Sequence, residues 1–326
     1  MLDQEARVKA QRFGFHVSLD VVLEAIRGVP GRHAAELLEH RVHPLDRRRD
    51  ERKRAMRAMA GAKFPEKAAD PIIVHPDVRK MLLTAKAYAE GGRALSLYCA
   101  LLIDRELNHP DEKVRKDSAE MVALLTPIVK AFITDNGWIA TSGCMQVFGG
   151  HGFIKEWGME QYVRDSRINM IYEGTNTIQS LDLLGRKVLG DSGKKLKKFG
   201  KWIQTFIEEE GVNEAMQEFV NPLADLGDKV TKLTTELGMK AFGNADEVGA
   251  AAVDYLRVCG HLVLAYFWAR MAKVALEKSG SGDPFYVAKL HTARFYFAKL
   301  LPETAGLIRS ARRSEEHTSE LQSHHD

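Results

Sequence analysis

The chain has 326 residues, of which 45% are hydrophobic and 28% charged, so it can bury a core in one large or two ordinary domains. A formal net charge of +3 does not indicate a nucleic-acid or membrane partner. No uninterrupted apolar run reaches the roughly 18 to 20 residues of a membrane span. Cys99, Cys144 and Cys259 show no disulfide or metal-ligand spacing, and the N-terminus lacks a secretory signal. We therefore expect a reducing, cytoplasmic setting and no metal site.

The two ends differ in character from the rest of the chain. Residues 1–55 contain the run "RRRDERKR", and residues 313–326, "RSEEHTSELQSHHD", are similar to a translated sequencing-library adapter. We expect the first segment to be mis-translated and the second to be an adapter-derived tail. An arginine run without interleaved aromatic residues is usually a solvated arm, and nucleic-acid binding through residues 47–54 is the alternative hypothesis.

Helical spacing of apolar residues begins at Pro76, a residue suited to a first helical turn. Asp111 is predicted to cap a second helix, and Pro127 to kink it. The predicted helices cover residues 76–106, a segment from 111, a segment from about 138 to 150, 177–189, 196–209, 213–239, 245–277 and 284–309.

Strand-like alternation of useful length is missing from this pattern. The sequence therefore predicts an all-α protein with a helical bundle over residues 56–190 and a second helical bundle over residues 191–312.

One stretch carries a resemblance to a known family. Residues 146–179 read "QVFGGHGFIKEWGMEQYVRDSRINMIYEGTNTIQ". This resembles the signature of the C-terminal domain of acyl-CoA dehydrogenases, flavoenzymes that introduce an α,β double bond into acyl-CoA thioesters. The resemblance is dense over residues 70–187. The later helices resemble the extra C-terminal domain of a bacterial subgroup that includes methylthiopropanoyl-CoA dehydrogenases.

The resemblance implies FAD as cofactor, an acyl-CoA substrate and electron-transfer flavoprotein as acceptor. It also implies a homo-oligomer in which subunits share the FAD site.

Glu173 matches the family's catalytic base in "YEGT". The α-hydrogen of a thioester is weakly acidic, so a held and desolvated carboxylate is needed to remove it while hydride leaves the β-carbon for flavin N5. Gly174 would let the backbone turn beside the thioester, and Tyr172 would flank it. Without the resemblance, Glu173 would read as a solvated loop acid and Tyr172 as a packing residue.

A glycine cluster precedes this motif, at Gly149, Gly150 and Gly152. Such backbone can approach a phosphate or adenine closely, although helix ends also collect glycine. The resemblance implies that Gln146 and Gly150, with Gly149 beside them, contact the FAD of a neighbouring subunit. It places Thr175 against the flavin dinucleotide near the base, with Asn176 and Gln179 as further candidates.

Four other polar residues near the motif call for an interpretation. Arg164 and Asp165 are expected to form a structural charge pair that stiffens the loop before Glu173. Arg186 lies thirteen residues past Glu173, one position away from an arginine that orients the base in some relatives. His151 is an acid–base candidate that the reaction does not need.

The resemblance also has a gap. Such an enzyme should begin with a helical domain and a β-domain that covers one face of the flavin, and we find neither in this sequence. We therefore expect a fragment that is inactive alone. The alternative is a non-catalytic helical module for oligomerisation or interaction.

Overall fold

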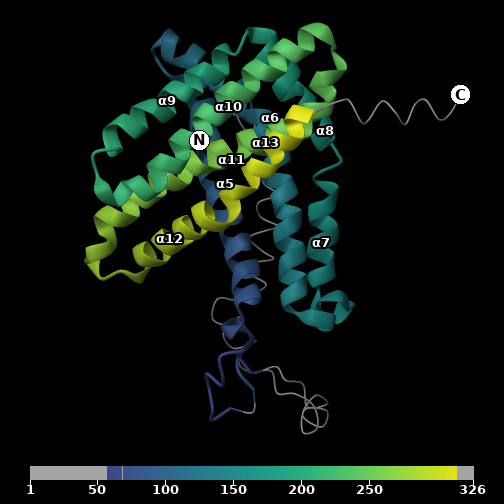
Figure 1. The fold of residues 1–326 in the computed structure, drawn as a ribbon, viewed down its shortest axis with the longest axis vertical. Coiled ribbons are helices and arrows are strands. Elements are labelled where there is room, and N and C mark those ends of the chain that lie inside the picture. Colours follow the sequence, from purple (N-terminus) through teal and green to yellow (C-terminus); the bar gives the residue numbers. More distant parts are fainter. Residues whose placement is uncertain (1–56, 68, 314–326) are drawn as a thin grey trace, which may run out of the picture.

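The computed structural model describes residues 57–67 and 69–313 (Figure 1). The predictions for residues 1–55 and for the tail from residue 314 lie outside the described residues, as does the arginine run. Within the described part the chain is helical and has no strand, so the all-α prediction is confirmed.

Two long antiparallel helices form the frame of the first half. α5 (Pro76–Asn108) begins at Pro76, and α6 (Glu112–Val147) is capped by Asp111, whose carboxylate accepts a 2.8 Å hydrogen bond from the Lys113 amide. Pro127 lies inside α6 as expected. The prediction of a separate helix from about residue 138 is wrong, because α6 continues through Gly137 to Val147.

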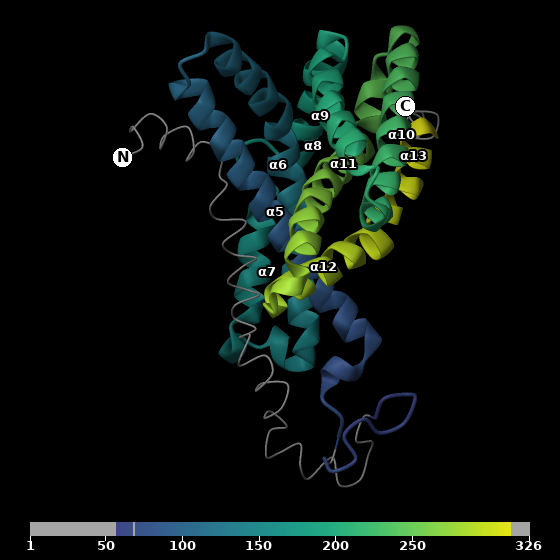
Figure 2. The ribbon, with the colours of Figure 1, turned by 90° about the vertical axis from the view of Figure 1, so that its left-hand side faces the viewer.

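The chain then reverses through two short 3₁₀ turns, Gly149–Phe153 and Lys155–Trp157, into α7 (Met159–Ile168). α7 lies alongside the second half of α6 (Figures 1 and 2). A small apolar cluster, made of Ala85, Ala89, Ala140, Cys144 and Met159, joins α5, α6 and α7. A loop leads from α7 to α8 (Asn176–Leu181).

After α8 the helix widens into a π-helical segment, Asp182–Val188. The following helices are α9 (Lys194–Glu210), α10 (Gln217–Gly243), α11 (Asp246–Lys278), α12 (Pro284–Phe295) and α13 (Thr304–Arg313). The single helix predicted over residues 284–309 is instead α12, a π-helical segment Tyr296–Leu300, a 3₁₀ turn at Pro302 and α13.

α11 is the central helix of the fold. It contacts α5, α6, α8, α10, α12 and α13, and it carries the fully buried Trp268 and Tyr255. Gly260 lets α11 approach α6 closely, because a Cβ atom at this position would lie 2.3 Å from the Phe132 ring. One apolar core therefore runs from Ala87 to Ala311 and includes residues of both predicted bundles. The boundary at residue 190 stays a prediction.

In the described part of the chain one helix, residues 246–281, is long and apolar enough to cross a membrane by length and composition. Charged and polar residues interrupt this helix, so the sequence shows no long apolar run although the mean hydropathy of its most apolar window is high. Within the most apolar window of that helix, 67% is buried inside the protein, as in the core helix of a globular fold.

Candidate active site

Glu173 lies on a tight turn between α7 and α8, and we call residues 170–176 the Glu173 turn. Its φ of 53° and the φ of 85° at Gly174 are both in the left-handed region. The Asn176 amide donates to the Met170 carbonyl at 3.1 Å and closes the turn, while Thr175 caps α8 through the Ile178 amide. The backbone thus places the Glu173 side chain at the surface, where it is exposed.

The left-handed conformation at Glu173 has an energetic cost. Residues with a Cβ atom are disfavoured there by about 1–2 kcal/mol, so other contacts must hold the turn. Glu173 and Ser192 are the two non-glycine residues with positive φ among those described. Gly174 adopts the left-handed conformation at little cost, because glycine has no Cβ atom. A Cβ atom at this position would also lie 3.1 Å from Gln179 Nε2.

Lys130 on α6 supplies one of these contacts. Its ammonium donates to the Gly174 carbonyl and to Asn176 Oδ1, each at 2.8 Å, across more than 40 residues of sequence. Asn176 Nδ2 in turn donates to Asp135 Oδ1 at 2.6 Å and to Thr134 Oγ1 at 2.9 Å. Side chains of α6 therefore tie down the end of the Glu173 turn.

Burial shapes the protonation of this cluster. Desolvation lowers the pKa of Lys130, against the opposing charges of Asp135 and Glu173. Burial raises the pKa of Asp135, partly offset by the hydrogen bond from Asn176. Burial also raises the pKa of Tyr172, and the Glu173 charge adds to this effect. The side chains of Lys130, Asp135 and Tyr172 around the turn are thus partly desolvated.

A second cluster of polar side chains lies near Asp135, between α6 and the last helices. Arg257 on α11 makes a bidentate ion pair with Glu303, whose Nη2–Oε2 distance is 2.9 Å. The fully buried His261 bonds to the Tyr296 hydroxyl through Nδ1 at 3.0 Å, and its Nε2 lies 3.4 Å from Glu303 Oε2. The guanidinium also lies over the Phe132 ring, 5.8 Å from its centroid. The C-terminal helices therefore stabilise the part of α6 that holds the turn.

The glycine cluster, defined as residues 146–153, is open rather than packed. Gln146, Gly149 and Gly150 are exposed, and a Cβ at either glycine would meet nothing within 4 Å. Gly149 has a φ of 59°. Gly152 differs, because a Cβ there would lie 2.3 Å from the Met145 carbonyl oxygen. His151 packs its ring edge-on against Trp157, with centroids 5.2 Å apart.

The structure separates the predicted site residues into two groups. Tyr172, Glu173, Gly174 and Thr175 lie together beside Lys130, whereas Gln146, Gly149 and Gly150 lie at the far end of the α6–α7 hairpin (Figure 1). The eighteen residues of α6 from Lys130 to Val147 span about 25 Å at ~1.5 Å of rise per residue. One ligand-binding site in a single copy of the chain would have to bridge this length.

The predicted Arg164–Asp165 charge pair is not supported by the geometry. Among the ion pairs of the described residues, Arg164 and Asp165 do not pair with each other, and Asp165 instead accepts from Gln161 Nε2 at 2.7 Å. Adjacent residues on a helix point in different directions, which explains the error. Arg186 pairs with Asp182 in its own helical segment, with Nε 2.7 Å from Oδ1.

The sequence reasoning missed Lys130 and Asp135, and it treated Asn176 as a secondary candidate. The available signal was a lysine and an aspartate in the otherwise apolar stretch "PIVKAFITD" of α6. Charged residues are rarely buried unless they are paired, so they imply polar partners elsewhere in the chain. The sequence pattern alone could not show that Asn176 is this partner.

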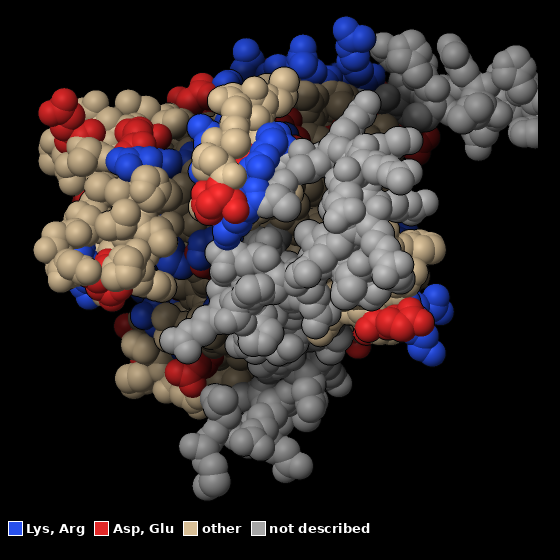
Figure 3. Space-filling model, turned by 90° about the horizontal axis from the view of Figure 1, so that it is seen from below, with Lys and Arg blue, Asp and Glu red and all other residues tan. Residues whose placement is uncertain are grey.

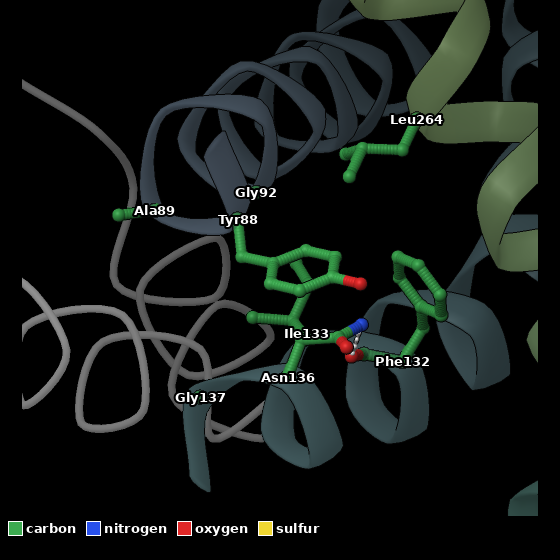
Figure 4. A pocket seen from close by; sticks show the side chains of 8 residues that line it. All are labelled: Tyr88, Ala89, Gly92, Phe132, Ile133, Asn136, Gly137 and Leu264. Atoms are coloured by element: carbon green, nitrogen blue, oxygen red, sulfur yellow. Dashed lines mark hydrogen bonds between the residues drawn. The ribbon is translucent and has the colours of Figure 1, made fainter. Parts of the chain in front are cut away.

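A small pocket lies between α5, α6 and α11, as Figure 4 shows. It is lined by Tyr88, Ala89, Gly92, Phe132, Ile133, Asn136, Gly137 and Leu264. Asn136 Nδ2 donates to the Phe132 carbonyl at 2.8 Å, and its buried Oδ1 lacks a partner. The pocket is mainly apolar and contains none of the predicted site residues.

Figure 3 shows one face of the molecule, on which acidic and basic side chains are mixed and neither sign dominates the described residues. A search of the described part of the chain found no group of three or more potential ligands for a metal ion.

Comparison with known proteins agrees with the fold and the motif. Residues 52–189 match a family model described as "Acyl-CoA dehydrogenase, C-terminal domain", and residues 199–322 match "Acetyl-CoA dehydrogenase C-terminal like". The fold is similar to that of an acyl-CoA dehydrogenase from Bacillus anthracis solved with FAD, with a TM-score of 0.67 and 17% identity over 96% of this chain and 50% of that one.

Two curated relatives are closer in sequence. The 3-methylmercaptopropionyl-CoA dehydrogenase of Ruegeria pomeroyi is 37% identical, covering 72% of this chain and 40% of the relative. The broad-specificity linear acyl-CoA dehydrogenase FadE5 of Mycobacterium tuberculosis is 32% identical, covering 70% and 39%. The chain belongs to the acyl-CoA dehydrogenase family and corresponds to its C-terminal portion. It spans about 40% of the length of these relatives.

Proposed function

We propose that this chain takes part in the flavin-dependent α,β-dehydrogenation of an acyl-CoA thioester, with Glu173 as the base. The observation that carries this proposal is the Glu173 turn itself. It presents an exposed carboxylate on a left-handed backbone that α6 holds in place, beside Tyr172 and Gly174. A solvated loop acid would not need a disfavoured conformation held by a lysine 43 residues earlier in the chain.

In this proposal a Glu173 carboxylate oxygen takes the α-proton of the thioester. Gly174 lets the backbone lie close to the thioester, and the Tyr172 ring flanks it. Bound FAD supplies the acceptor for the hydride that leaves the β-carbon, so the substrate is oxidised and the flavin reduced. The exposed position of Glu173 leaves its carboxylate accessible to the α-carbon of a bound thioester.

We propose that four residues hold FAD, namely Gln146, Gly149, Gly150 and Thr175. The open backbone of the glycine cluster fits a phosphate-bearing ligand, because no side chain blocks its approach. The distance between this cluster and Glu173 supports a site in which the cluster of one copy serves the flavin of another. The proposal further includes a homo-oligomer and electron-transfer flavoprotein as the electron acceptor. It also includes a cytoplasmic location and a role in fatty acid metabolism.

Flavin binding tests the first part. We expect the purified 326-residue chain to bind FAD weakly and to be inactive alone, because it spans about 40% of its relatives' length. A stoichiometric flavin absorbance spectrum after gel filtration would contradict this expectation.

Catalysis is tested in a flavin-loaded chimera, in which this chain replaces the matching region of the R. pomeroyi relative. We expect 3-methylmercaptopropionyl-CoA or a linear acyl-CoA to bleach the flavin. Glu173→Gln should slow bleaching by about 10²–10⁴-fold and leave FAD bound. Bleaching at the unmutated rate would disprove the base assignment. If the chimera folds and binds FAD without bleaching, a non-catalytic helical module becomes the better interpretation.

A further inference from the structure

The contacts of Lys130 go beyond the residues that the proposed reaction assigns. Its ammonium lies between the Gly174 carbonyl and Asn176 Oδ1, at 2.8 Å from each. Gly174 directly follows the proposed base, and Asn176 is the first residue of α8. One side chain thus bonds to the turn on one side and to the helix that follows it.

Lys130 starts from a fixed helix, and its acceptor Asn176 is also held in place. Lys130 projects from the middle of the rigid α6, and Asn176 is oriented by Asp135 at 2.6 Å and by Thr134 at 2.9 Å. The Asp135 carboxylate also supplies a nearby opposite charge in a partly buried cluster. Hydrogen bonds from a charged donor are stronger than those between neutral groups, so the ammonium is well suited to hold these two acceptors.

The turn needs such a contact because its backbone is disfavoured. Two successive residues, Glu173 and Gly174, have positive φ. Hydrogen bonds within the turn close it at the Met170 carbonyl and cap α8 at Thr175. The Asn176 side chain attaches the last residue of the turn to α6. The bond from Lys130 to the Gly174 carbonyl adds an attachment directly at the strained residues.

We propose that Lys130 is a positioning residue that holds the Glu173 turn in its left-handed conformation and so fixes where the Glu173 carboxylate is presented. This inference rests on the proposed function for its catalytic meaning. Its structural part concerns this chain alone and can be tested without flavin or substrate.

The structural test uses amide hydrogen exchange in the full 326-residue chain. Lys130→Met removes the ammonium and keeps the length of the side chain. We expect exchange in residues 170–176 to rise at least 10-fold, with that of residues 146–153 unchanged. The control is Lys229→Met, because Lys229 is half exposed and pairs with Asp225 in its own helix. Wild-type exchange in the turn of the Lys130→Met variant would overturn the proposal.

Two further variants keep the test decisive. Lys130→Arg retains the charge and should restore most of the protection. If Lys130→Met loses helical circular dichroism, Lys130→Gln replaces it, since it keeps a shorter donor. We then expect exchange in the turn between that of wild type and complete loss of protection. Full protection in Lys130→Gln would also overturn the proposal.

The catalytic meaning is tested in the flavin-loaded chimera. Lys130→Met should lower kcat at least 10-fold with less than a threefold change in KM, and Lys130→Arg should recover part of kcat. An unchanged kcat together with faster exchange would show that the turn does not need this anchor for the reaction. If exchange rises but the unmutated chimera does not bleach, the proposed function fails and the structural role of Lys130 stands.

Discussion

The Glu173 turn and the glycine cluster lie at opposite ends of the same helical hairpin, and the protein holds them in opposite ways. The turn has a disfavoured backbone that Lys130 and Asn176 attach to α6. The cluster is open, because a Cβ atom added at Gly149 or Gly150 would have no other atom within 4 Å. This is the difference that the proposed function requires, with a fixed carboxylate for proton transfer and a cluster that would gain its contacts from a ligand or a second copy.

Among the substitutions that compare the two regions, loss of the Phe132 ring should reduce the stability of the protein most. Phe132 is 1% exposed and lies on α6 two residues from Lys130, packed against Tyr88 and His261. Phe132→Ala should lower the free energy of unfolding by about 3–5 kcal/mol, because it leaves a cavity in the core. Urea denaturation measures this. The control, Phe153→Ala in the glycine cluster, removes a ring that is 76% exposed and should change stability by under about 0.5 kcal/mol. If the two variants lost the same free energy of unfolding, the glycine cluster would be as tightly packed as the part of α6 that holds the turn, and the contrast would be wrong.

Alanine at two glycines compares the regions directly. Gly174→Ala should cost about 1–2 kcal/mol of stability, since alanine disfavours a φ of 85° and its Cβ would lie 3.1 Å from Gln179. Gly150→Ala should leave stability within about 0.5 kcal/mol, because the position is open. In the flavin-loaded chimera, however, Gly150→Ala should weaken FAD binding. Thermal unfolding and flavin titration measure the two effects, and a stability loss at Gly150 equal to that at Gly174 would argue against an open cluster.

The pH dependence of stability tests the polar group behind the turn. Burial raises the pKa of Glu303, but the nearby His261 ring and the Arg257 guanidinium outweigh this effect and lower it to about 2, from 4.5. A lowered folded-state pKa means that the carboxylate adds stability above pH 4.5, and this contribution is lost as the pH falls from 4.5 towards 2. Glu303→Gln should therefore destabilise the protein more at pH 6 than at pH 3.

Urea denaturation at the two pH values provides the measurement for Glu303→Gln. Its control is Glu156→Gln, at an exposed position beside the glycine cluster, which should have little effect at either pH. A Glu303→Gln effect that is the same at pH 6 and pH 3 would show that this ion pair does not contribute through its charge.

The smallest expected effect is a gain. Glu173→Gly should raise stability by about 0.5 kcal/mol, because glycine relieves the left-handed strain but loses more entropy on folding. Ser192→Gly, at a φ of 57°, is the matched control and should gain a similar amount. In the chimera only Glu173→Gly should abolish bleaching. A loss of stability at Glu173 alone would mean that its carboxylate stabilises the turn.

Local signals in the sequence predicted the helices with good start and stop residues. Pro76 and Asp111 marked the first two long helices correctly, because capping depends on neighbouring residues. The separate helix predicted from about residue 138 is part of α6, because the buried Gly137 is accommodated inside that helix despite the weak helical preference of glycine. The all-α class followed from the helical spacing of apolar residues.

The candidate site was predictable only in part. The resemblance indicated Glu173 and its neighbours, but the link from Lys130 to Asn176 joins residues 46 positions apart and has no local signature. The failed Arg164–Asp165 pair shows the opposite error, in which adjacency in sequence was taken for contact. Tertiary packing of α8 on α6 and α11 decides which polar residues meet.

The π-helical segment Asp182–Val188 bears on how this chain should be aligned with its relatives. Its hydrogen-bonded rings each take in one residue more than those of an α-helix, so an inserted residue can be absorbed without breaking the helix. Numbering that runs correctly through Glu173 can therefore slip by one position before Arg186.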